Sequence, residues 1–433
     1  MTKKVHWPVP FLWGTSTSSH QIEGNNRAND WWAWEQAGRL KEPSGKACDH
    51  VHRFRQDFDI ISSLGHNAYR FSLEWSRFEP EEGRWNEEAF KFYDEIFQEL
   101  AKRKIEPIVT LHHFTNPEWF AQKGGWVQND TIRYFSRYVR KVIQRYGKYV
   151  RFWITINEPL VYLYHGFYAG VWPPGIQSFK DSMRVFRHQV MAHAEAYRVI
   201  HQYYKEELHK NVWVSFAMHM SHFTPCRSNS VMDQWAVFIR NWFANELFLN
   251  AVTSGFLFFP GIFCEFLPMK HCLDFIGLNY YTRDFVRFSA LSGINFVGMV
   301  CDKGHHRDQI QELNSMGWEV YAEGLYRVLK QLRKYHLPIM ITENGIATND
   351  DQQRARFIEN HLGSVERARA EGSPVTGYFY WSLLDNFEWA HGFDPRFGIV
   401  HVNFETQERK IRESAQVLGR LCRKIKSETE ALH

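Results

Sequence analysis

Short apolar runs alternate with longer amphipathic segments along most of the chain. Each run is almost continuously apolar and rich in β-branched and aromatic residues, which is typical of a strand buried on both faces. Such strands belong to parallel sheets. The eight runs are Phe11–Thr15, Ala68–Leu73, Pro107–Leu111, Phe152–Ile156, Val212–Ala217, Phe275–Asn279, Ile339–Thr342 and Gly377–Trp381.

Apolar residues recur at helical spacing between these runs. The clearest segments are Glu87–Lys102, Ile132–Tyr146, Ser182–Tyr204, Tyr321–Lys334 and Gln352–Glu371. Strand–helix alternation repeated eight times favours a closed (β/α)8 TIM barrel, which we take as one domain over residues 1–433. An open doubly wound sheet is the alternative. It is disfavoured because no glycine-rich phosphate loop follows the first run, in which Gly14 is isolated.

Polar and aromatic residues gather where the predicted strands end, which is the active-site face of a (β/α)8 barrel. Two of them are carboxylates: Glu158 follows the fourth run and Glu343 follows the seventh. Carboxylates are rarely buried unless they are paired or used, and two facing each other across a pocket are what glycosidic-bond cleavage needs. The other residues are Ser18, Ser19, His20, Gln21, Arg70, His112, His113, Asn157, Asn279, Tyr280, Tyr281, Asn344 and Trp381, with His219 and His222 near the fifth strand.

Composition excludes several classes of partner. The net charge is only +4 over 433 residues, without long runs of one sign, which argues against nucleic acid as a partner. No apolar run is long enough for a membrane span, and the stretch Met1–Pro8 is too polar for a signal peptide. Six cysteines form no CxxC pair and no common zinc pattern, so we expect free thiols and a cytoplasmic location. They are Cys48, Cys226, Cys264, Cys272, Cys301 and Cys422.

Four segments together resemble glycoside hydrolase family 1, the β-glucosidase family. They are Phe11–Gly24 (FLWGTSTSSHQIEG), Thr155–Pro159 (TINEP), Ile341–Gly345 (ITENG), and Asn386–Ala390 (NFEWA) followed by Arg396–Gly398 (RFG). Any one of these short motifs is weak evidence, but the ordered set from about Phe11 to about Arg412 is specific. The 17 tryptophans add weight where they border these motifs, because tryptophan stacks on sugar rings.

The resemblance implies a retaining β-glycosidase with Glu158 as general acid/base and Glu343 as nucleophile. It implies that Arg70 and Tyr281 hold the nucleophile, and Asn279 shares a strand face with Tyr281. Trp381 matches the residue that stacks beneath the sugar. The positions that match hydrogen-bonding contacts to the sugar are Gln21, His113, Asn157, Glu388 and Trp389.

The chain also departs from the family pattern. The segment at about residues 250–274 is shorter than usual, so we expect a covering helix or loop to be missing on the acceptor side. Phe114 and Thr115 stand where many members have tryptophan and aspartate. Trp172, in the unusual turn Val171–Gly175, is a candidate platform for the leaving group (the aglycone).

Neighbouring charges predict the protonation of the two glutamates. Arg70 and Tyr281 favour the charged form of Glu343, whose negative charge should in turn raise the pKa of Glu158. No metal-ligand spacing surrounds His112 or His113, and we expect neither a metal nor a cofactor.

The expected substrates are small β-glycosides or oligosaccharides. Glu388 suits the 4- and 6-hydroxyls of glucose or galactose, and His391 is an untypical neighbour that bears on the preference among glucose, galactose and fucose. The absence of lysine from 386 to 394 argues against 6-phosphoglycosides. A transglycosylase using the same residues, a non-catalytic sugar-binding relative and an endo-acting barrel hydrolase remain alternatives. The pattern does not set the oligomeric state.

Overall fold

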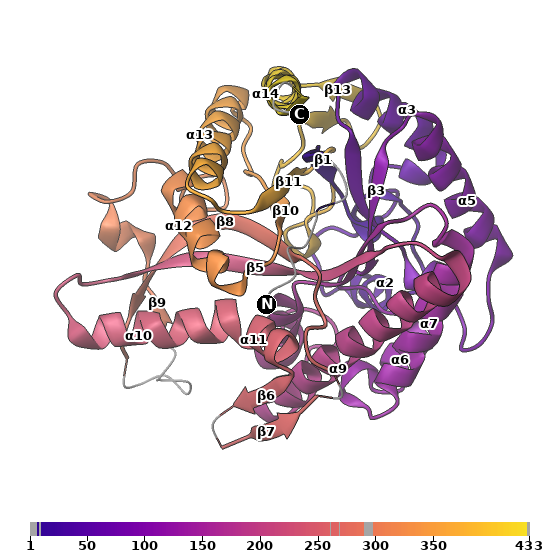
Figure 1. The fold of residues 1–433 in the computed structure, drawn as a ribbon, viewed down its shortest axis with the longest axis horizontal. Coiled ribbons are helices and arrows are strands. Elements are labelled where there is room, and N and C mark those ends of the chain that lie inside the picture. The colour runs from indigo at the N-terminus through magenta and orange to yellow at the C-terminus, as the bar shows by residue number, and fades with distance from the viewer. Residues whose placement is uncertain (1–6, 8–9, 260, 268, 290–297, 431–433) are drawn as a thin grey trace.

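Eight parallel strands close into a barrel at the centre of the molecule (Figure 1). The computed structural model describes residues 7, 10–259, 261–267, 269–289 and 298–430. The ring runs in chain order, and the pairing of β11 with β1 closes it. This confirms the predicted (β/α)8 architecture. The strands are β1 (Leu12–Ser16), β2 (Ala68–Ser72), β3 (Glu106–His112), β4 (Phe152–Asn157), β5 (Trp213–Pro225), β8 (Ile276–Arg287), β10 (Ile339–Asn344) and β11 (Val375–Trp381).

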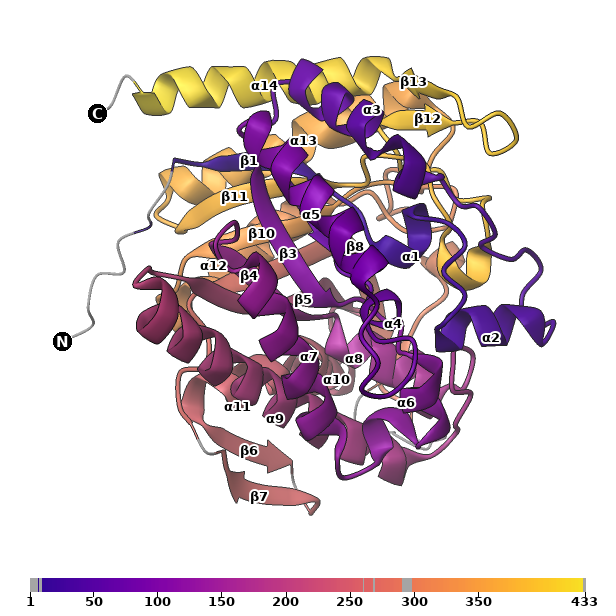
Figure 2. The same cartoon turned by 90° about the vertical axis from the view of Figure 1, so that its right-hand side faces the viewer.

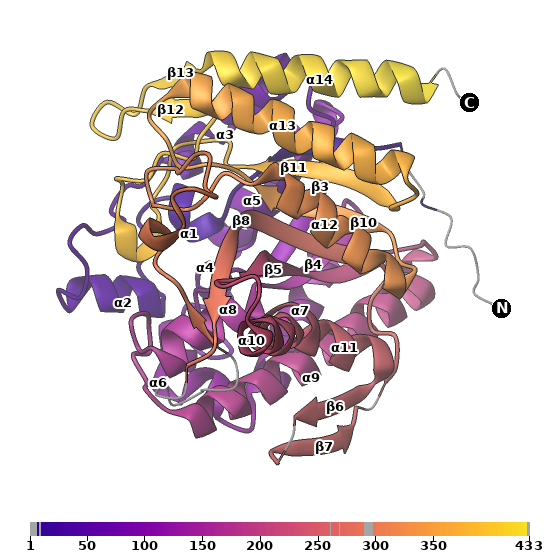
Figure 3. The same ribbon diagram turned by 90° about the vertical axis from the view of Figure 1, so that its left-hand side faces the viewer.

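The predicted helices form the outer wall. They are α5 (Glu87–Lys102), α7 (Thr131–Tyr146), α9 (Phe179–Tyr203), α12 (Ala322–Leu332) and α13 (Asp351–Ala370), joined by α3 (His50–Ser63) and α14 (Glu413–Glu430). Helix α5 begins where the Asn86 side chain accepts a hydrogen bond from the Glu88 backbone, and Glu87 and Glu88 favour the positive end of the helix dipole. Figure 3 shows α12, α13 and α14 lying side by side on this wall.

Further helices and strands lie in the connections between these elements. They are α1 (Ser19–Ile22), α2 (Asp30–Gln36), α4 (Trp75–Phe78), α6 (Glu118–Gln122), α8 (Pro159–Leu163), α10 (Val231–Asn241), α11 (Leu247–Ser254), β6 (Phe256–Phe259), β7 (Phe263–Phe266), β9 (Met299–Val300), β12 (Val400–Val402) and β13 (Arg409–Ile411). In Figure 2 the start of β1 and the end of α14 lie on one side, and α1 and α2 lie on the opposite side, where the strands end.

Two apolar layers stabilise the barrel. Side chains such as Leu12, Ile108 and Phe152 fill its interior, and a second, larger layer packs between the strands and the helices. Both faces of each strand are therefore buried, which explains why the runs in the sequence are nearly continuously apolar. No helix in the described part of the chain combines the length and the apolar character needed to cross a membrane.

Strands β5 and β8 are much longer than the sequence predicted. They leave the barrel rim as a pair, with one register shift between Met220 and His222, and stay paired as far as Pro225 beside Val286. Strand β9 pairs with the far end of β8. The polar residues of these extensions led the sequence pattern to predict loops there. Pairing between the two strands satisfies their backbone groups beyond the barrel, which a pattern within one strand does not reveal.

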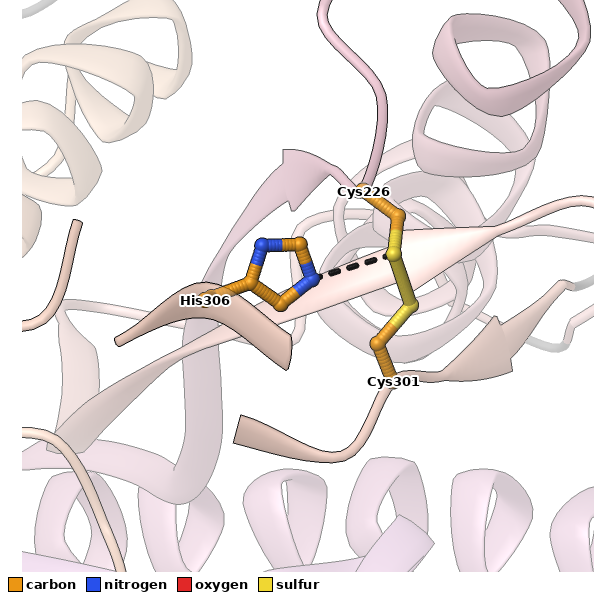
Figure 4. A group of neighbouring side chains, drawn as sticks. All are labelled: Cys226, Cys301 and His306. Atoms are coloured by element: carbon orange, nitrogen blue, oxygen red, sulfur yellow. Dashed lines mark hydrogen bonds between the residues drawn. A yellow bond between two sulfur atoms is a disulfide. The ribbon is translucent and has the colours of Figure 1, made fainter. Parts of the chain in front are cut away.

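A disulfide joins Cys226 to Cys301 at the end of this arm (Figure 4). Strands β5 and β9 lie on either side of Val286, and each of the two cysteines directly follows one of these strands. The prediction of free thiols is therefore wrong for this pair, although it holds for Cys48, Cys264 and Cys272. The side chain of Cys422 lies outside the described residues, as does most of the stretch Met1–Pro8.

His306 lies beside the disulfide, with its Nε2 3.0 Å from the Cys226 sulfur (Figure 4). These three residues are the one group of potential metal ligands found among the described residues. In the disulfide form neither sulfur is a thiolate, so the group offers no thiolate to a metal.

The segment at about residues 250–274, which the sequence marks as short, holds the end of α11 and the β6–β7 hairpin. This hairpin lies at the lower edge of the molecule in Figure 1. Pro260 and Pro268 within it lie outside the described residues.

Candidate active site

A cavity of about 240 Å³ lies at the C-terminal ends of the barrel strands. A larger groove of about 840 Å³ runs along the outer wall between α7 and α9, but it contains none of the predicted site residues. The smaller cavity brings most of them together, and Arg70 and Asn279 contact its carboxylates from behind. The predicted residues that line it are Gln21, His113, Asn157, Glu158, Trp172, Tyr281, Glu343, Trp381, Glu388 and Trp389.

Two donors hold the Glu343 carboxylate. Arg70 Nη1 lies 2.5 Å from Oε1, and the Tyr281 hydroxyl donates to Oε2 at 2.6 Å. Arg70 is fully buried, and its Nε also donates to Thr110 Oγ1. A buried guanidinium needs such partners on every side, so β2 presents it in one fixed position.

The two residues after Glu343 fix its direction. Asn344 points the other way, donating to the Tyr280 carbonyl at 2.7 Å and accepting from the Tyr378 hydroxyl at 2.9 Å. Gly345 packs against the Trp381 backbone so closely that a β-carbon would lie 1.8 Å from the Trp381 carbonyl oxygen. The ITENG segment therefore needs glycine for close packing, while strand alternation aims the glutamate inward.

Glu158 sits at a sharp turn between β4 and α8. Its backbone is left-handed, with a φ of 43°, and its N–H donates to the Ala217 carbonyl at 2.8 Å. Pro159 then occupies the first turn of α8, where its missing N–H costs nothing. Asn279 donates to Glu158 Oε1 at 2.7 Å, and His219 Nδ1 lies 3.7 Å from the same oxygen.

Asn157 connects the two carboxylate environments. Its Oδ1 accepts from Arg70 at 2.7 Å and from Asn279 at 3.2 Å. Its amide nitrogen lies 3.3 Å from His113 Nε2. Burial, helped by the charge on Arg70, holds the pKa of His113 well below its ordinary value, so this imidazole is neutral and accepts the hydrogen bond.

Gln21 and Glu388 form a second polar end of the cavity. The Gln21 amide donates to Glu388 Oε2 at 3.2 Å and to the Phe387 carbonyl at 2.8 Å. The His113 ring stacks against Trp381, with ring centres 5.9 Å apart, and a further apolar wall comes from Trp389. The cavity thus combines hydrogen-bonding groups, which match the hydroxyls of a sugar, with flat aromatic faces, which match the apolar C–H faces of a pyranose ring.

The pKa values of the two central carboxyls differ from the sequence prediction. Burial and the negative charge of Glu158 raise the pKa of Glu343 to about 7, against the opposing effect of Arg70 and Tyr281. Burial also acts on Glu158, but His219, Asn279 and Arg70 outweigh it and lower the pKa of Glu158. The predicted raised pKa on Glu158 is therefore wrong for the free site, because the prediction did not include His219.

Glu388 provides a prediction about stability. Burial and the charges of Glu343 and Glu158 raise its pKa from 4.5 to about 8. The unfolded chain ionises near pH 4.5 while the folded chain stays protonated, so this group destabilises the wild type progressively as pH rises to about 8. Glu388→Gln removes the charge. We expect the variant to be more stable than wild type by about 1–2 kcal/mol at pH 8, with little difference at pH 4.5.

Chemical denaturation at the two pH values measures this difference. Glu319→Gln, which removes a carboxylate paired with Arg283 rather than one facing other carboxylates, should instead destabilise the protein. A gain for Glu388→Gln that is equal at pH 4.5 and pH 8 would show that ionisation is not its cause.

The structure adds cavity residues that the motifs did not identify. His165, Met316 and Trp318 line the cavity, together with His219 on β5, and Phe397 of the RFG motif, to which no role was assigned, lines it too. His219 had one sequence signal, its position just beyond the fifth strand. Met316 and Trp318 lie far from any strand in the sequence and carried no signal. Trp172 lines the cavity while packing on His165, with ring centres 4.4 Å apart.

Comparison with known proteins identifies the family of this chain. The sequence model of the family described as glycosyl hydrolase family 1 matches residues 3–426. Beta-glucosidase A of Thermotoga maritima is 35% identical, over 94% of this chain and 96% of its own length. The structure of a beta-glycosidase from Pyrococcus horikoshii is 42% identical, covers 98% of this chain and 96% of its own, and superposes with a TM-score of 0.89.

A beta-glucosidase from Thermotoga maritima, solved in complex with glucoimidazole, is 33% identical with a TM-score of 0.87, over 97% of this chain and 99% of its own. The match to the family model and the similarity to these relatives extend over nearly the whole sequence. The chain therefore belongs to glycosyl hydrolase family 1.

Proposed function

We propose that this protein is a retaining β-glycosidase, with β-glucosides as its main substrates, that removes terminal non-reducing β-D-glycosyl residues. One observation carries the proposal: a carboxylate held by two donors, Glu343, shares a cavity of sugar size with a second carboxylate, Glu158. β-Galactosides and β-fucosides are the expected secondary substrates. Membership of family 1 supports the retaining mechanism.

In the first step Glu343 attacks the anomeric carbon while the glycosidic C–O bond breaks. Its electron pair leaves with the aglycone oxygen, which takes the proton of Glu158. The product is a glycosyl ester of Glu343. Arg70 and Tyr281 fix the attacking oxygens before reaction, so little reorganisation is needed.

In the second step Glu158 takes a proton from water, and the water oxygen attacks the anomeric carbon. The ester bond breaks and Glu343 regains its negative charge. Two displacements at one carbon give net retention of configuration. Asn157 is placed to bind the sugar 2-hydroxyl, because it is anchored to both Arg70 and Asn279 between the two glutamates.

The remaining cavity residues are proposed to recognise the sugar. Gln21 and Glu388 face the 4- and 6-hydroxyls, and His113 and Trp389 add hydrogen bonds to the same ring. Trp381 forms the stacking surface. The glucoimidazole complex of the Thermotoga maritima relative supports a glucose-sized ligand. Trp172, Trp318 and Met316 line the same cavity and are proposed to form the acceptor side.

A panel of aryl β-glycosides tests this function. We expect cleavage of the β-glucoside, weaker cleavage of the galactoside and fucoside, and none of the 6-phosphoglucoside, because the described residues that line the cavity include no lysine or arginine. NMR should detect the β-anomer first. Cleavage of no member of the panel would contradict the enzyme proposal and favour a sugar-binding protein, and glycosides of added alcohols as the main product would identify a transglycosylase.

Small β-glycosides or oligosaccharides are the partners in this proposal. A cytoplasmic location remains a prediction, and the Cys226–Cys301 disulfide weakens it because disulfides are rare in reducing compartments outside hyperthermophiles.

A further inference from the structure

We propose that His219 is a positioning residue for Glu158: the two side chains share one proton, and His219 thereby sets the pH range in which the departing oxygen can be protonated. The inference rests on the proposed acid/base role of Glu158. His219 belongs to none of the motifs that define the chain's likeness to its family.

Strand geometry places the imidazole beside the carboxylate. Strand β5 lies between β4 and β8 in the barrel. Ala217 accepts from the Glu158 backbone and faces the barrel interior. His219 is two residues further along β5, on the same face, and it lies beside Asn279 of β8 in the register. The side chain therefore enters the cavity next to Glu158.

Both contacts to Glu158 fall on one oxygen. Asn279 Nδ2 donates to Oε1 at 2.7 Å, and His219 Nδ1 lies 3.7 Å from that same atom. The arrangement leaves Oε2 as the oxygen that can face a substrate. Because Asn279 fixes the carboxyl group, His219 acts on its charge more than on its direction.

Negative groups surround His219 on several sides. Glu158 comes from β4, Glu343 from β10 and Asp284 from β8, and all three favour the charged imidazole. Tyr281 of β8 stacks on the ring at 6.1 Å, and the Ser221 hydroxyl lies 3.4 Å from Nε2. A charged His165, which reaches the cavity between α8 and α9, would disfavour the charged form of His219. Burial lowers the pKa of His165 to about 4, so this imidazole is neutral at neutral pH.

These surroundings place the shared proton in two positions. Burial disfavours the charged imidazole, yet Glu158 outweighs burial and raises the pKa of His219, while His219 lowers the pKa of Glu158. The pair therefore holds one proton either as imidazolium with carboxylate or as imidazole with carboxylic acid. Only the second form can protonate a departing oxygen.

Sharing changes the pH at which this proton is lost. A proton with two sites leaves the pair at a higher pH than it would leave the carboxyl alone. The pair thus loses its last proton at a higher pH than an isolated carboxyl would, and the apparent alkaline limit of the reaction moves with it. At lower pH part of that proton sits on His219, where it does not serve the leaving group.

His219→Asn tests the proposal. Asparagine keeps an N–H near Oε1 but does not titrate. With an alkyl or other poor-leaving-group β-glucoside, we expect the alkaline limb of kcat/KM to move down by roughly half a pH unit or more. The acid limb, which follows ionisation of Glu343, should stay in place. His222→Asn on the same strand is the matched control, since His222 does not line the cavity, and its profile should match wild type.

Further variants distinguish a failure of the role proposed for His219 from a failure of the role proposed for Glu158. In a Glu158→Gln background, measured with a dinitrophenyl glucoside that departs without a proton, His219→Asn should shift no limb, because its effect acts through Glu158. If Glu158→Gln keeps full activity on poor leaving groups, the proposed role of Glu158 fails and this inference fails with it. If Glu158→Gln is inactive but the alkaline limb of His219→Asn is unmoved or moves up, only the role of His219 is overturned. His219→Gln repeats the measurement should His219→Asn not fold.

Discussion

Glu343→Ala is expected to lower kcat for aryl β-glucosides by roughly 10⁴-fold or more, because it removes the group that forms the covalent intermediate. The lost carboxylate is also the partner of Arg70 and Tyr281, so their donors remain aimed at an empty position. A small anion such as formate or azide can occupy that position. It should restore part of the activity with an activated substrate.

The product distinguishes this explanation from simple damage. An external azide ion attacks from the side that Glu343 occupied, so the rescued product should be the α-glycosyl azide, with inverted configuration. Glu343→Gln is the control, because its side chain fills the site and should not be rescued. Rescue that yields the β-product, or activity near the wild-type level without any anion, would contradict the role proposed for Glu343.

Glu158→Ala is expected to affect substrates according to their leaving groups. Poor leaving groups need the proton, so kcat/KM for alkyl or phenyl glucosides should fall by about 10³-fold or more. A dinitrophenyl glucoside departs without help, and its kcat/KM should change by less than about tenfold. Steady-state kinetics over a series of aryl glucosides measures this as a steeper dependence on leaving-group acidity.

Hydrolysis of the glycosyl ester, the second step, gives an independent test with the same variant. Without Glu158 no base activates water, so the glycosyl ester should accumulate with the dinitrophenyl substrate. Azide needs no base, and it should release the ester as a β-glycosyl azide, with retained configuration. Equal losses for good and poor leaving groups would contradict the role of Glu158 as proton donor.

The barrel was predictable because both faces of its strands are buried. Runs such as Phe152–Ile156 carry this burial in their own composition, and their observed ends differ by only a residue or so. The arm formed by β5 and β8 was not predictable, because its stability comes from pairing between distant segments rather than from a pattern within either one. The Cys226–Cys301 disulfide follows from that pairing, so the sequence did not predict it either.

The candidate site likewise contains residues that the sequence could identify and residues that it could not. Residues next to a strand end, such as Glu158, Glu343 and Gln21, appear in short motifs because local backbone geometry places them. Trp318 enters the cavity from a long segment after β9, and nothing local marks it. The lowered pKa of Glu158 was missed for a related reason: it depends on His219, whose position relative to Glu158 is set by the packing of β5 against β4.

The arm beyond the barrel rim has a consequence for how this protein can change. Arg283 on β8 pairs with Glu319 at 2.6 Å, close to Trp318, and the disulfide joins the end of β5 to the start of the same segment. The part of the proposed acceptor side that holds Trp318 is thus anchored to the arm beyond the barrel rim, away from the strand ends that carry Glu158 and Glu343. Exchange of the segment between Cys301 and Glu319 among relatives should change which aglycones are accepted while the two glutamates keep their positions. Aglycone preference and bond cleavage can therefore evolve separately.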